Sequence, residues 1–448
     1  MPQDIDVDLA QLTDLIGQAK RAGADAADAI MVDSSSLSAI LRMGETERVE
    51  RSESADLGLR VFVGNRSAIV SSADRKKPAL EAMVERAVAM ARQVPEDPYS
   101  GLADAGDVVT EIPAIDLADS KEPSAETLIE RARTAEQAAL AVQGVTNSEA
   151  ADASWGQTRV WLAASNGFTG HYVRTGSSTV ASVVAGEGTS METDYDFSSA
   201  VFAEDLEDAD EIGKRAGAKA VSRLNARKVE TARVPVVFDP RVANSLLRHL
   251  AGAISGPAIA RGTSFLKDRM DEQIFADGIS VIDDPHRPRG LRSKPFDAEG
   301  LANSRRAFIE NGRLTSWVMD LASSRQLGLR STGNASRGTS GPPGPSVTNF
   351  YLEPGNSDPK DLIGAIGNGF YVTQMMGQGI NMVTGDYSRG ASGFWIEKGE
   401  IAYPVNEVTV AGNLADMFER LTPANDLSFH YGVDAPTVRV DGMTVAGK

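Results

Sequence analysis

The first 225 residues of the chain contain one order of elements twice, and this repetition constrains the fold more than any other feature. In each copy an amphipathic helix precedes a set of strand-like segments, and a second helix follows them. We expect helices over residues 8–21, 78–93, 124–142 and 204–224, and strands over residues 29–32, 36–43, 57–63, 67–72, 158–165, 168–175 and 178–186. The pattern predicts an N-terminal α+β domain on an antiparallel sheet, residues 1–225, with similar halves at about 1–110 and 120–225.

The remaining chain, residues 226–448, has a different character, because short strands and glycine-containing turns dominate it. Asp239 and Pro240 predict the start of a helix over residues 240–254, since Asp accepts hydrogen bonds from free N–H groups and Pro tolerates the first helical position. Three dipeptides predict hairpin turns, namely Asn311-Gly312, Lys398-Gly399 and Asp441-Gly442. We therefore expect a mainly-β C-terminal domain, a twisted antiparallel sheet or a partial barrel. The Gly-, Ser- and Pro-rich residues 331–346 predict a long surface loop or flap.

Cysteine is absent from the sequence, and only four histidines occur, His171, His249, His286 and His430. No disulfide, iron–sulfur cluster, Cys-ligated zinc or cysteine nucleophile is therefore available. No two histidines have the short helical spacing of a motif such as HExxH. If the chain is an enzyme, it lacks the usual residues of a metallohydrolase or a thiol hydrolase.

The net charge of −17 opposes binding to nucleic acid, since phosphate neutralisation supplies most non-specific affinity. The basic residues 286–292 are the exception, and we interpret them as a solvated loop or as donors of internal ion pairs. The N-terminal segment is acidic and lacks the apolar core of a secretory signal. No apolar run approaches the length of about 18 residues that a membrane span needs. These observations predict a cytoplasmic protein without a membrane or nucleic-acid partner.

Two short motifs suggest chemistry only weakly. Ser264 and Lys267 match S-x-x-K, in which a lysine one helical turn later activates a serine nucleophile, but the accompanying SDN and KTG elements are missing. Asp283 and Asp284 form a pair of carboxylates, and the following Pro285 favours a turn instead. The chain has no G-x-S-x-G elbow, no P-loop and no dinucleotide-binding glycine motif after a strand, which excludes the activities that depend on them.

Residues 375–395 combine six glycines with several polar and aromatic side chains. Glycine at this density lets the backbone approach a ligand or another strand closely. One interpretation is a strand edge that contacts a peptide, and the other is a tightly packed turn of the sheet core. The candidate peptide-binding residues are Asp386, Tyr387, Ser388, Arg389, Gly390 and Ser392.

Three longer segments, residues 250–275, 322–336 and 376–414, resemble the TldD/PmbA family, specifically its TldE (PmbA) branch, and the resemblance covers nearly the whole chain. Members of this family were formerly described as modulators of DNA gyrase. The resemblance implies a cytoplasmic metallopeptidase of two subunits, TldD and TldE, that degrades unfolded proteins or peptides. It also implies that the TldD subunit binds zinc through an HExxxH helix and a cysteine near its C-terminus.

When the chain is aligned with the TldD motif through the shared residues 261–264, the two histidines of the motif align with Leu247 and Gly252. The glutamate of the motif aligns with Arg248. Leucine and glycine offer no lone pair to zinc, and an arginine cannot act as a base near neutral pH. His249 matches neither ligand position, so we interpret it as a structural residue. The resemblance therefore implies that this chain holds no catalytic metal and that a TldD-type partner supplies the zinc.

Three hypotheses follow from the sequence. In the first, the chain is the TldE-type subunit of a heterodimeric zinc metallopeptidase and is inactive without its partner. In the second, it is a non-catalytic homodimer that binds peptides or acts like a chaperone. In the third, it is an independent serine hydrolase that uses Ser264 and Lys267.

Overall fold

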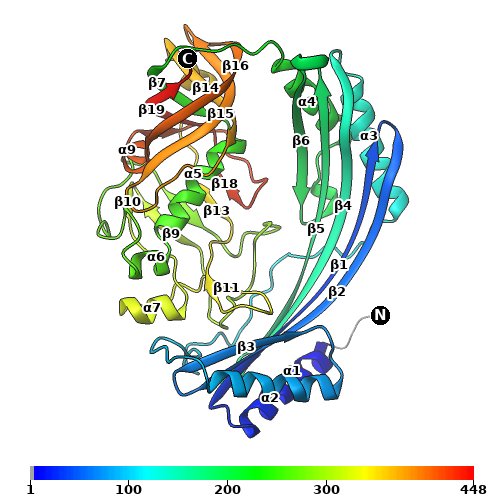
Figure 1. Cartoon of the computed structure of the whole chain (residues 1–448), viewed down its shortest axis with the longest axis vertical. Coiled ribbons are helices and arrows are strands. Elements are labelled where there is room, and N and C mark those ends of the chain that lie inside the picture. Colours follow the sequence, from blue (N-terminus) through cyan, green and yellow to red (C-terminus); the bar gives the residue numbers. More distant parts are fainter. Residues whose placement is uncertain (1–4) are drawn as a thin grey trace.

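The computed structural model describes residues 5–448, and the first four residues of the N-terminal segment discussed above lie outside this range. The two copies of the N-terminal pattern together form one six-stranded sheet (Figure 1). The first copy consists of α1 (Ile5–Arg21), β1 (Ala26–Arg42), β2 (Glu45–Val63), β3 (Arg66–Ser72) and α2 (Lys77–Ala91). The second consists of α3 (Ala125–Leu140), β4 (Val145–Ala164), β5 (Thr169–Ala185), β6 (Glu192–Ala200) and α4 (Ala209–Ser222), with short 3-10 turns at Gly188–Ser190 and Ala203–Asp205. The strand order is β3-β2-β1-β4-β5-β6, so the copies meet where β1 pairs with β4.

The strands are longer than the sequence predicts. Residues 29–32 and 36–42 are parts of the single strand β1, which ends one residue before the predicted end at 43, and residues 168–175 and 178–186 are both largely in β5. The predicted breaks fall where small polar residues interrupt the apolar alternation. The hydrogen-bonded ladder nevertheless continues, because the neighbouring strands pair with these residues on both sides. Residues 45–54 of β2 also extend this ladder, and their charged, exposed side chains gave no strand-like pattern.

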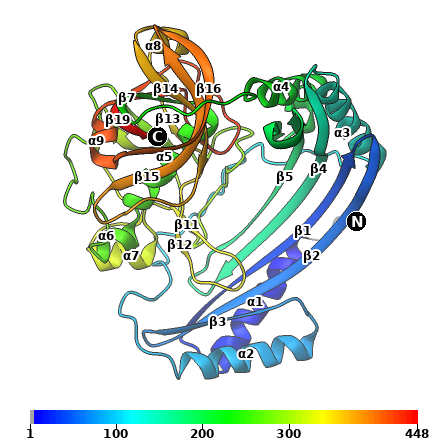
Figure 2. The same ribbon diagram turned by 45° about the horizontal axis from the view of Figure 1, so that its top comes forward.

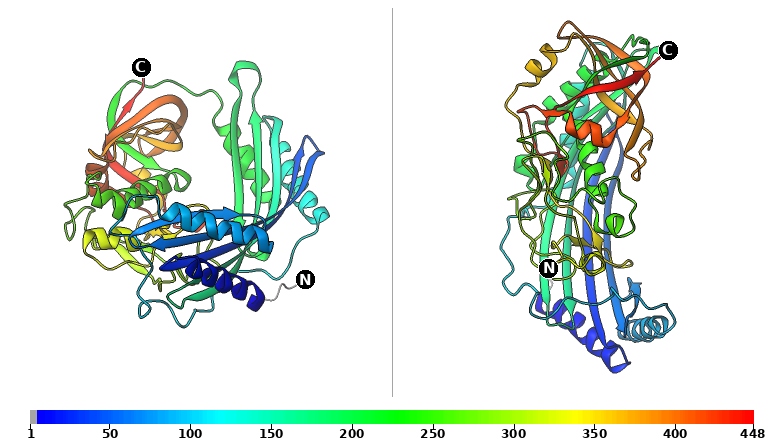
Figure 3. Two further views of the ribbon diagram at one scale, coloured as in Figure 1. Left: turned by 60° about the horizontal axis from the view of Figure 1, so that its bottom comes forward. Right: turned by 90° about the vertical axis from the view of Figure 1, so that its left-hand side faces the viewer.

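Both pairs of helices cover the same face of the sheet. Alternate side chains of β1 point to one face, and on that face Met31 packs against α1 and α2 while Leu37 and Ala39 pack against α3. Ile30 points to the opposite face and contacts Phe296 of the C-terminal region. The sheet curves around this region, as Figure 2 shows, and its strands run along most of the length of the molecule (Figure 3).

The C-terminal region is built on a closed barrel of five strands. These are β7 (Ala232–Phe238), β14 (Asn368–Met376), β15 (Asp386–Glu397), β16 (Glu400–Asn413) and β19 (Val438–Ala446). Their order is β16-β15-β14-β7-β19, and the pairing of β16 with β19 closes the barrel, while β17 (Leu421–Pro423) adds to β19. The predicted α+β fold with a barrel-like C-terminal part is confirmed.

The rest of this region connects the barrel to the N-terminal sheet. A second sheet has the order β10-β9-β8-β13-β18, and β11 pairs with β12. Their bounds are β8 (Val281–Asp283), β9 (Arg306–Glu310), β10 (Arg313–Leu314), β11 (Ala335–Ser336), β12 (Gly344–Pro345), β13 (Phe350–Leu352) and β18 (Val433–Asp434). The helices are α5 (Pro240–Ala253), α6 (Gly256–Ala260), α7 (Leu321–Leu327), α8 (Pro359–Gly364) and α9 (Leu414–Glu419). None of the helices in the described part of the chain combines the length and apolar character needed to cross a membrane.

Two of the three predicted hairpin turns are present. Asn311-Gly312 and Lys398-Gly399 join β9 to β10 and β15 to β16, and all four residues have positive φ. The prediction for Asp441-Gly442 was wrong, since β19 continues through these residues. The pairing of β19 with β7 shifts by one residue between Val440 and Met443, so Gly442 lies in a β-bulge.

The prediction of a surface loop or flap over residues 331–346 was also wrong in part. The segment contains β11 and β12, and Arg337 between them is buried against the N-terminal sheet, where it pairs with Asp28 of β1. Gly58 of β2 lies so close to Thr339 that a Cβ atom there would come 2.0 Å from the Thr339 carbonyl oxygen. The segment is therefore a contact between the two parts of the molecule.

Candidate functional site

Helix α5 has two distinct faces. The Asp239 side chain caps its first turn by accepting a hydrogen bond from the Arg241 N–H at 3.0 Å, and Pro240 follows the cap as the sequence predicts. Its apolar face is buried in the main core and includes Leu246, Leu247 and Leu250. The opposite face presents polar side chains one helical turn apart, Arg241, Asn244, Ser245 and Arg248.

The polar face of α5 lines a cavity of about 390 Å³. The other walls are the end of β14, the beginning of β15 and one residue of the N-terminal sheet, so both parts of the molecule contribute. The lining side chains are Tyr195, Arg241, Val242, Asn244, Ser245, Arg248, Thr373, Gln374, Met375, Met376 and Arg389. None of these residues is acidic.

Arg241 joins the cavity to the N-terminal sheet. Its guanidinium donates to both carboxylate oxygens of Asp194 on β6, at 2.6 and 3.1 Å, and its Nε donates to the Thr373 carbonyl at 2.7 Å. Although burial acts in the opposite direction, the hydrogen bonds to Asp194 raise the pKa of Arg241 above its ordinary value. Two parallel hydrogen bonds fix orientation as well as distance. Arg241 therefore fixes the position of α5 relative to β6 and β14.

Of the six predicted peptide-binding residues, only Arg389 lines the cavity. Asp386 and Ser388 are exposed, Gly390 is half-buried, and Tyr387 and Ser392 are buried. The expected free strand edge is wrong for this segment, because β15 pairs with β16 over its whole length and with β14 from Gly390 onward. Before Gly390, residues 377–385 fold back onto β15, and the Ser388 N–H donates to the Gly379 carbonyl at 2.7 Å. With β16 on one side and β14 and residues 377–385 on the other, β15 has no row of free backbone groups for a peptide.

His249 lies beside the cavity, with its ring in edge-to-face contact with Tyr387 at 6.0 Å between ring centres. Burial, together with the nearby positive charge of Arg389, lowers the pKa of His249 to about 4. The imidazole is therefore neutral near pH 7. Its Nε2 has no hydrogen-bond partner among the described residues, and the ring contact with Tyr387 is what agrees with a packing role.

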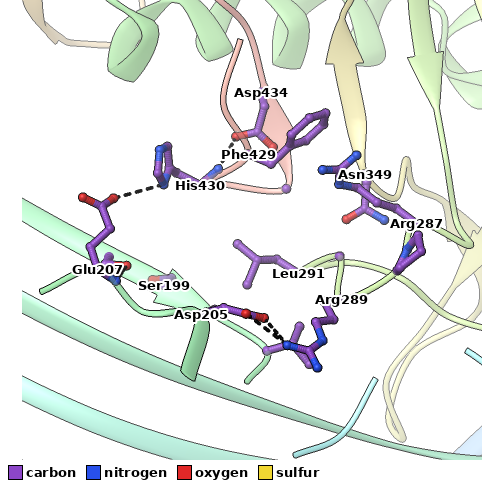
Figure 4. A pocket seen from close by; sticks show the side chains of 16 residues that line it. Ser199, Asp205, Glu207, Arg287, Arg289, Leu291, Asn349, Phe429, His430 and Asp434 are labelled. Atoms are coloured by element: carbon purple, nitrogen blue, oxygen red, sulfur yellow. Dashed lines mark hydrogen bonds and ion pairs between the residues drawn. The ribbon is translucent and has the colours of Figure 1, made fainter. Parts of the chain in front are cut away.

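A second cavity, of about 230 Å³, lies between β6 and the loops of the C-terminal region (Figure 4). The basic segment 286–292 forms one of its walls. Arg289 pairs with Asp116, Glu204 and Asp205 of the N-terminal part, at 2.8 to 2.9 Å, so at this residue the prediction of an internal ion-pair donor is confirmed. Because acidic residues of the protein already pair with Arg289, we interpret the second cavity as a structural contact and not as a ligand site.

The two short motifs do not form catalytic groups. The Ser264 hydroxyl is buried and donates to the Ala253 carbonyl at 2.6 Å, while the Lys267 side chain is exposed to solvent. Asp283 accepts hydrogen bonds from the backbone and hydroxyl of Thr348 and from Asn334, and burial raises its pKa to about 6. These contacts stabilise loops, and they leave the serine hydrolase hypothesis without a Ser–Lys pair.

Comparison with known proteins identifies the family. Profiles of three PmbA/TldA metallopeptidase domains match the chain: domain 1 at residues 27–91, the central domain at 118–224 and the C-terminal domain at 231–447. The protein named metalloprotease PmbA from Escherichia coli O157:H7 is 36% identical over 426 residues, which cover 95% of this chain and 93% of that protein. The chain belongs to the PmbA/TldD family. A PmbA homologue from Haemophilus influenzae is 35% identical over 432 residues, or 96% and 94% of the two chains, which supports the PmbA branch of the family.

Solved structures have the same fold as this PmbA-family chain. A proposed modulator of DNA gyrase from Bacteroides thetaiotaomicron matches with a TM-score of 0.91 and 26% identity, covering 100% of both chains. TldE from Thermococcus kodakarensis matches with a TM-score of 0.88 and 22% identity, covering 98% of this chain and 100% of that one. The relatives' names describe a family of metallopeptidases.

In this PmbA-family chain, the resemblance to TldD assigns the metal-motif positions to three residues whose side chains do not suit a zinc ion. Leu247 is 1% exposed and packs in the core, Arg248 is exposed and lines the cavity, and Gly252 has no side chain. A cationic guanidinium repels a metal ion, and neither other residue offers a donor atom. Within residues 5–448, no group of three or more His, Asp or Glu side chains has an arrangement that suits a metal.

Sequence reasoning missed most of the residues that line the cavity. Arg241, Asn244, Ser245 and Arg248 recur at the three- and four-residue spacing of a helix face, so their common direction was visible in the predicted helix. Tyr195 gave no such indication, because it reaches the cavity from a strand of the other part of the molecule.

Proposed function

We propose that this chain is the subunit of a two-subunit metallopeptidase that binds no catalytic metal, and that a TldD-type partner supplies the zinc and the base. The main support is the state of α5. Its cap, its apolar face and its position beside a cavity are intact, while Leu247, Arg248 and Gly252 occupy the positions of the metal motif. A capped helix beside a cavity that lacks the ligand side chains favours a role in shaping a substrate site.

In this proposal the chain acts in the cytoplasm and helps to hold an unfolded or extended peptide for its partner. The cavity beside α5 is the proposed contact, with Arg389 as the member of the predicted set that reaches it. Asp386 and Ser388 remain candidate contacts on the exposed face of β15.

Reconstitution tests this proposal. The purified chain should contain no stoichiometric zinc by elemental analysis and should not cleave a denatured protein. Cleavage should appear when a TldD-type chain is added, and a chelator should abolish it. Chelator-sensitive cleavage by the isolated chain would contradict the proposal.

Light scattering of the mixture separates the proposal from the homodimer hypothesis. A particle with the mass of one chain of each kind supports the peptidase subunit. If the chain remains a homodimer in the mixture and only binds unfolded peptides, the non-catalytic, chaperone-like hypothesis is correct instead.

A further inference from the structure

Two arginines of the cavity beside α5 have no acidic partner. Arg248 is exposed and Arg389 is half-buried, and neither forms an ion pair with any residue in the described part of the chain. The Arg389 Nε donates a hydrogen bond to the Gly377 carbonyl at 3.1 Å, and the residue lines the cavity. The third arginine, Arg241, is already neutralised by Asp194.

The protein as a whole carries a net charge of −17, and its acidic side chains outnumber the basic ones by 62 to 45. The cavity nevertheless contains no acidic side chain in its wall. It is therefore a local positive region, and the field there favours an anionic ligand group.

Asn244 gives a second, independent observation. This residue is 7% exposed and lines the same cavity, yet its side chain makes no hydrogen bond within residues 5–448. Buried amides are normally satisfied, and an amide has two N–H donors to offer. Because Asn244 lies one helical turn before Arg248 on the same face of α5, both side chains are placed to donate to one group in the cavity.

From this arrangement we propose that the cavity binds a carboxylate group of a peptide through Arg248 and Arg389, with Asn244 as an additional donor. Guanidinium groups bind carboxylates through charge-assisted hydrogen bonds. Met375 and Met376 form an adjacent apolar and adaptable wall that suits the side chain next to the carboxylate. A volume of about 390 Å³ lies at the small end of ligand sites, which span roughly 300–1,000 Å³, so the site suits one or two residues of a peptide.

The carboxylate has two sources, the C-terminus of a peptide or an Asp or Glu side chain. The inference rests on the proposed function only in taking the ligand to be a peptide. It makes no use of zinc or of cleavage, so binding measurements test it separately from the peptidase role.

Calorimetric titration of the full-length chain with three matched peptides tests the proposal. All three are short and acetylated at the N-terminus. The first ends in a free carboxylate and the second in an amide, and both have only uncharged side chains. The third ends in an amide and carries one internal Glu as its only charged side chain. We expect the first or the third to bind at least about tenfold more tightly than the second, and added salt to weaken this preference. Which of the two binds better identifies the source of the carboxylate.

Variants assign the preference to the cavity. Arg248→Gln and Arg389→Gln should each weaken carboxylate binding by about tenfold or more, and Arg389→Lys, which keeps the charge, should weaken it less. Arg86→Gln on the exposed face of α2 is the matched control and should have no effect. Circular dichroism checks that each variant is folded.

Three results would overturn the proposal. One is equal affinity for the free acid, the Glu-containing amide and the uncharged amide. Another is unchanged binding by both Gln variants when compared with Arg86→Gln. The third is the absence of measurable binding of any of the three peptides, both in the isolated chain and in its mixture with a TldD-type chain.

Discussion

Two regions where the N-terminal sheet meets the C-terminal region each contain a pair of arginines. The two pairs differ in burial and in whether an acidic residue binds them. In the buried ion cluster, Arg60 of β2 and Arg337 of the 331–346 segment both bind Asp28 of β1, and the three side chains are 2 to 7% exposed. In the cavity beside α5, Arg248 and Arg389 have no acid among the described residues and keep contact with solvent.

The difference teaches which arginines have a structural role. Removing a guanidinium from water is costly unless a carboxylate replaces the lost hydration. Although burial alone would raise the pKa of Asp28, Arg337 and Arg60 lower it below its ordinary value, so the carboxylate stays charged between them. Arg248 and Arg389 are accessible to solvent instead, so an incoming anion can reach them. We therefore expect substitutions in the first region to change stability and substitutions in the second to change binding.

The largest effect is expected for Asp28→Ala, because it leaves two buried guanidiniums without their shared carboxylate. Breaking a buried ion pair from one side costs about 3–5 kcal/mol of the free energy of unfolding. Denaturant unfolding measures the change. The control is Glu50→Ala, which removes an exposed pair with Arg48 and should cost less than about 1 kcal/mol. Similar losses for the two variants would break the comparison between buried and hydrated arginines.

A second effect concerns pH and Glu299, which is close to the buried ion cluster. Burial and the neighbouring Asp297 raise the pKa of Glu299 to about 8, from an ordinary value of 4.5. Between these two values the folded state holds a proton that the unfolded state has lost, so the free energy of unfolding falls as the pH rises. The slope from this group is at most about 1.4 kcal/mol per pH unit.

Glu299→Gln removes the titrating group and should flatten the stability profile over this range. Thermal or denaturant unfolding between pH 5 and 8, run side by side on both proteins, measures the difference. A wild-type profile that is as flat as that of the variant would show that Glu299 does not retain its proton on folding.

The smallest effect on stability is expected for Arg248→Gln. Arg248 is exposed on α5 and has no ion pair within residues 5–448, so the free energy of unfolding should change by no more than about 0.5 kcal/mol. Arg337→Gln is the counterpart in the buried ion cluster and should be strongly destabilising. Denaturant unfolding curves of the two variants measure both changes. A large decrease in the free energy of unfolding of Arg248→Gln would mean that the guanidinium stabilises the fold.

Features with local physical causes were predictable from the sequence. The cap at Asp239 and Pro240 predicted the start of α5, and the apolar spacing within residues 240–254 predicted its buried face. The turns at Asn311-Gly312 and Lys398-Gly399 were predictable because each needs only its own residues to accept positive φ. At Asp441-Gly442 the same local pattern formed a bulge, since β7 and β16 both pair with β19 and keep it extended.

The candidate site was less predictable. The sequence selected Arg389 and noted Arg248, but it also proposed Tyr387 and Ser392, which are both buried. The closure of the barrel decided this outcome, because the pairing of β16 with β19 depends on residues far apart in the chain. The role of Arg337 was hidden for the same reason, since a Gly- and Ser-rich segment gives no indication of a partner on β1.

By itself, then, the sequence determined the α+β composition, the repeated order of elements, the family and the absence of cysteine. These follow from helix and strand periodicity, from turn residues and from extended motifs, all of which are local along the chain. Only the tertiary structure decided which arginines are buried with an acid and which line a cavity without one. That distinction depends on solvent access and on distances between distant residues, and both exist only once the sheet and the barrel have packed together.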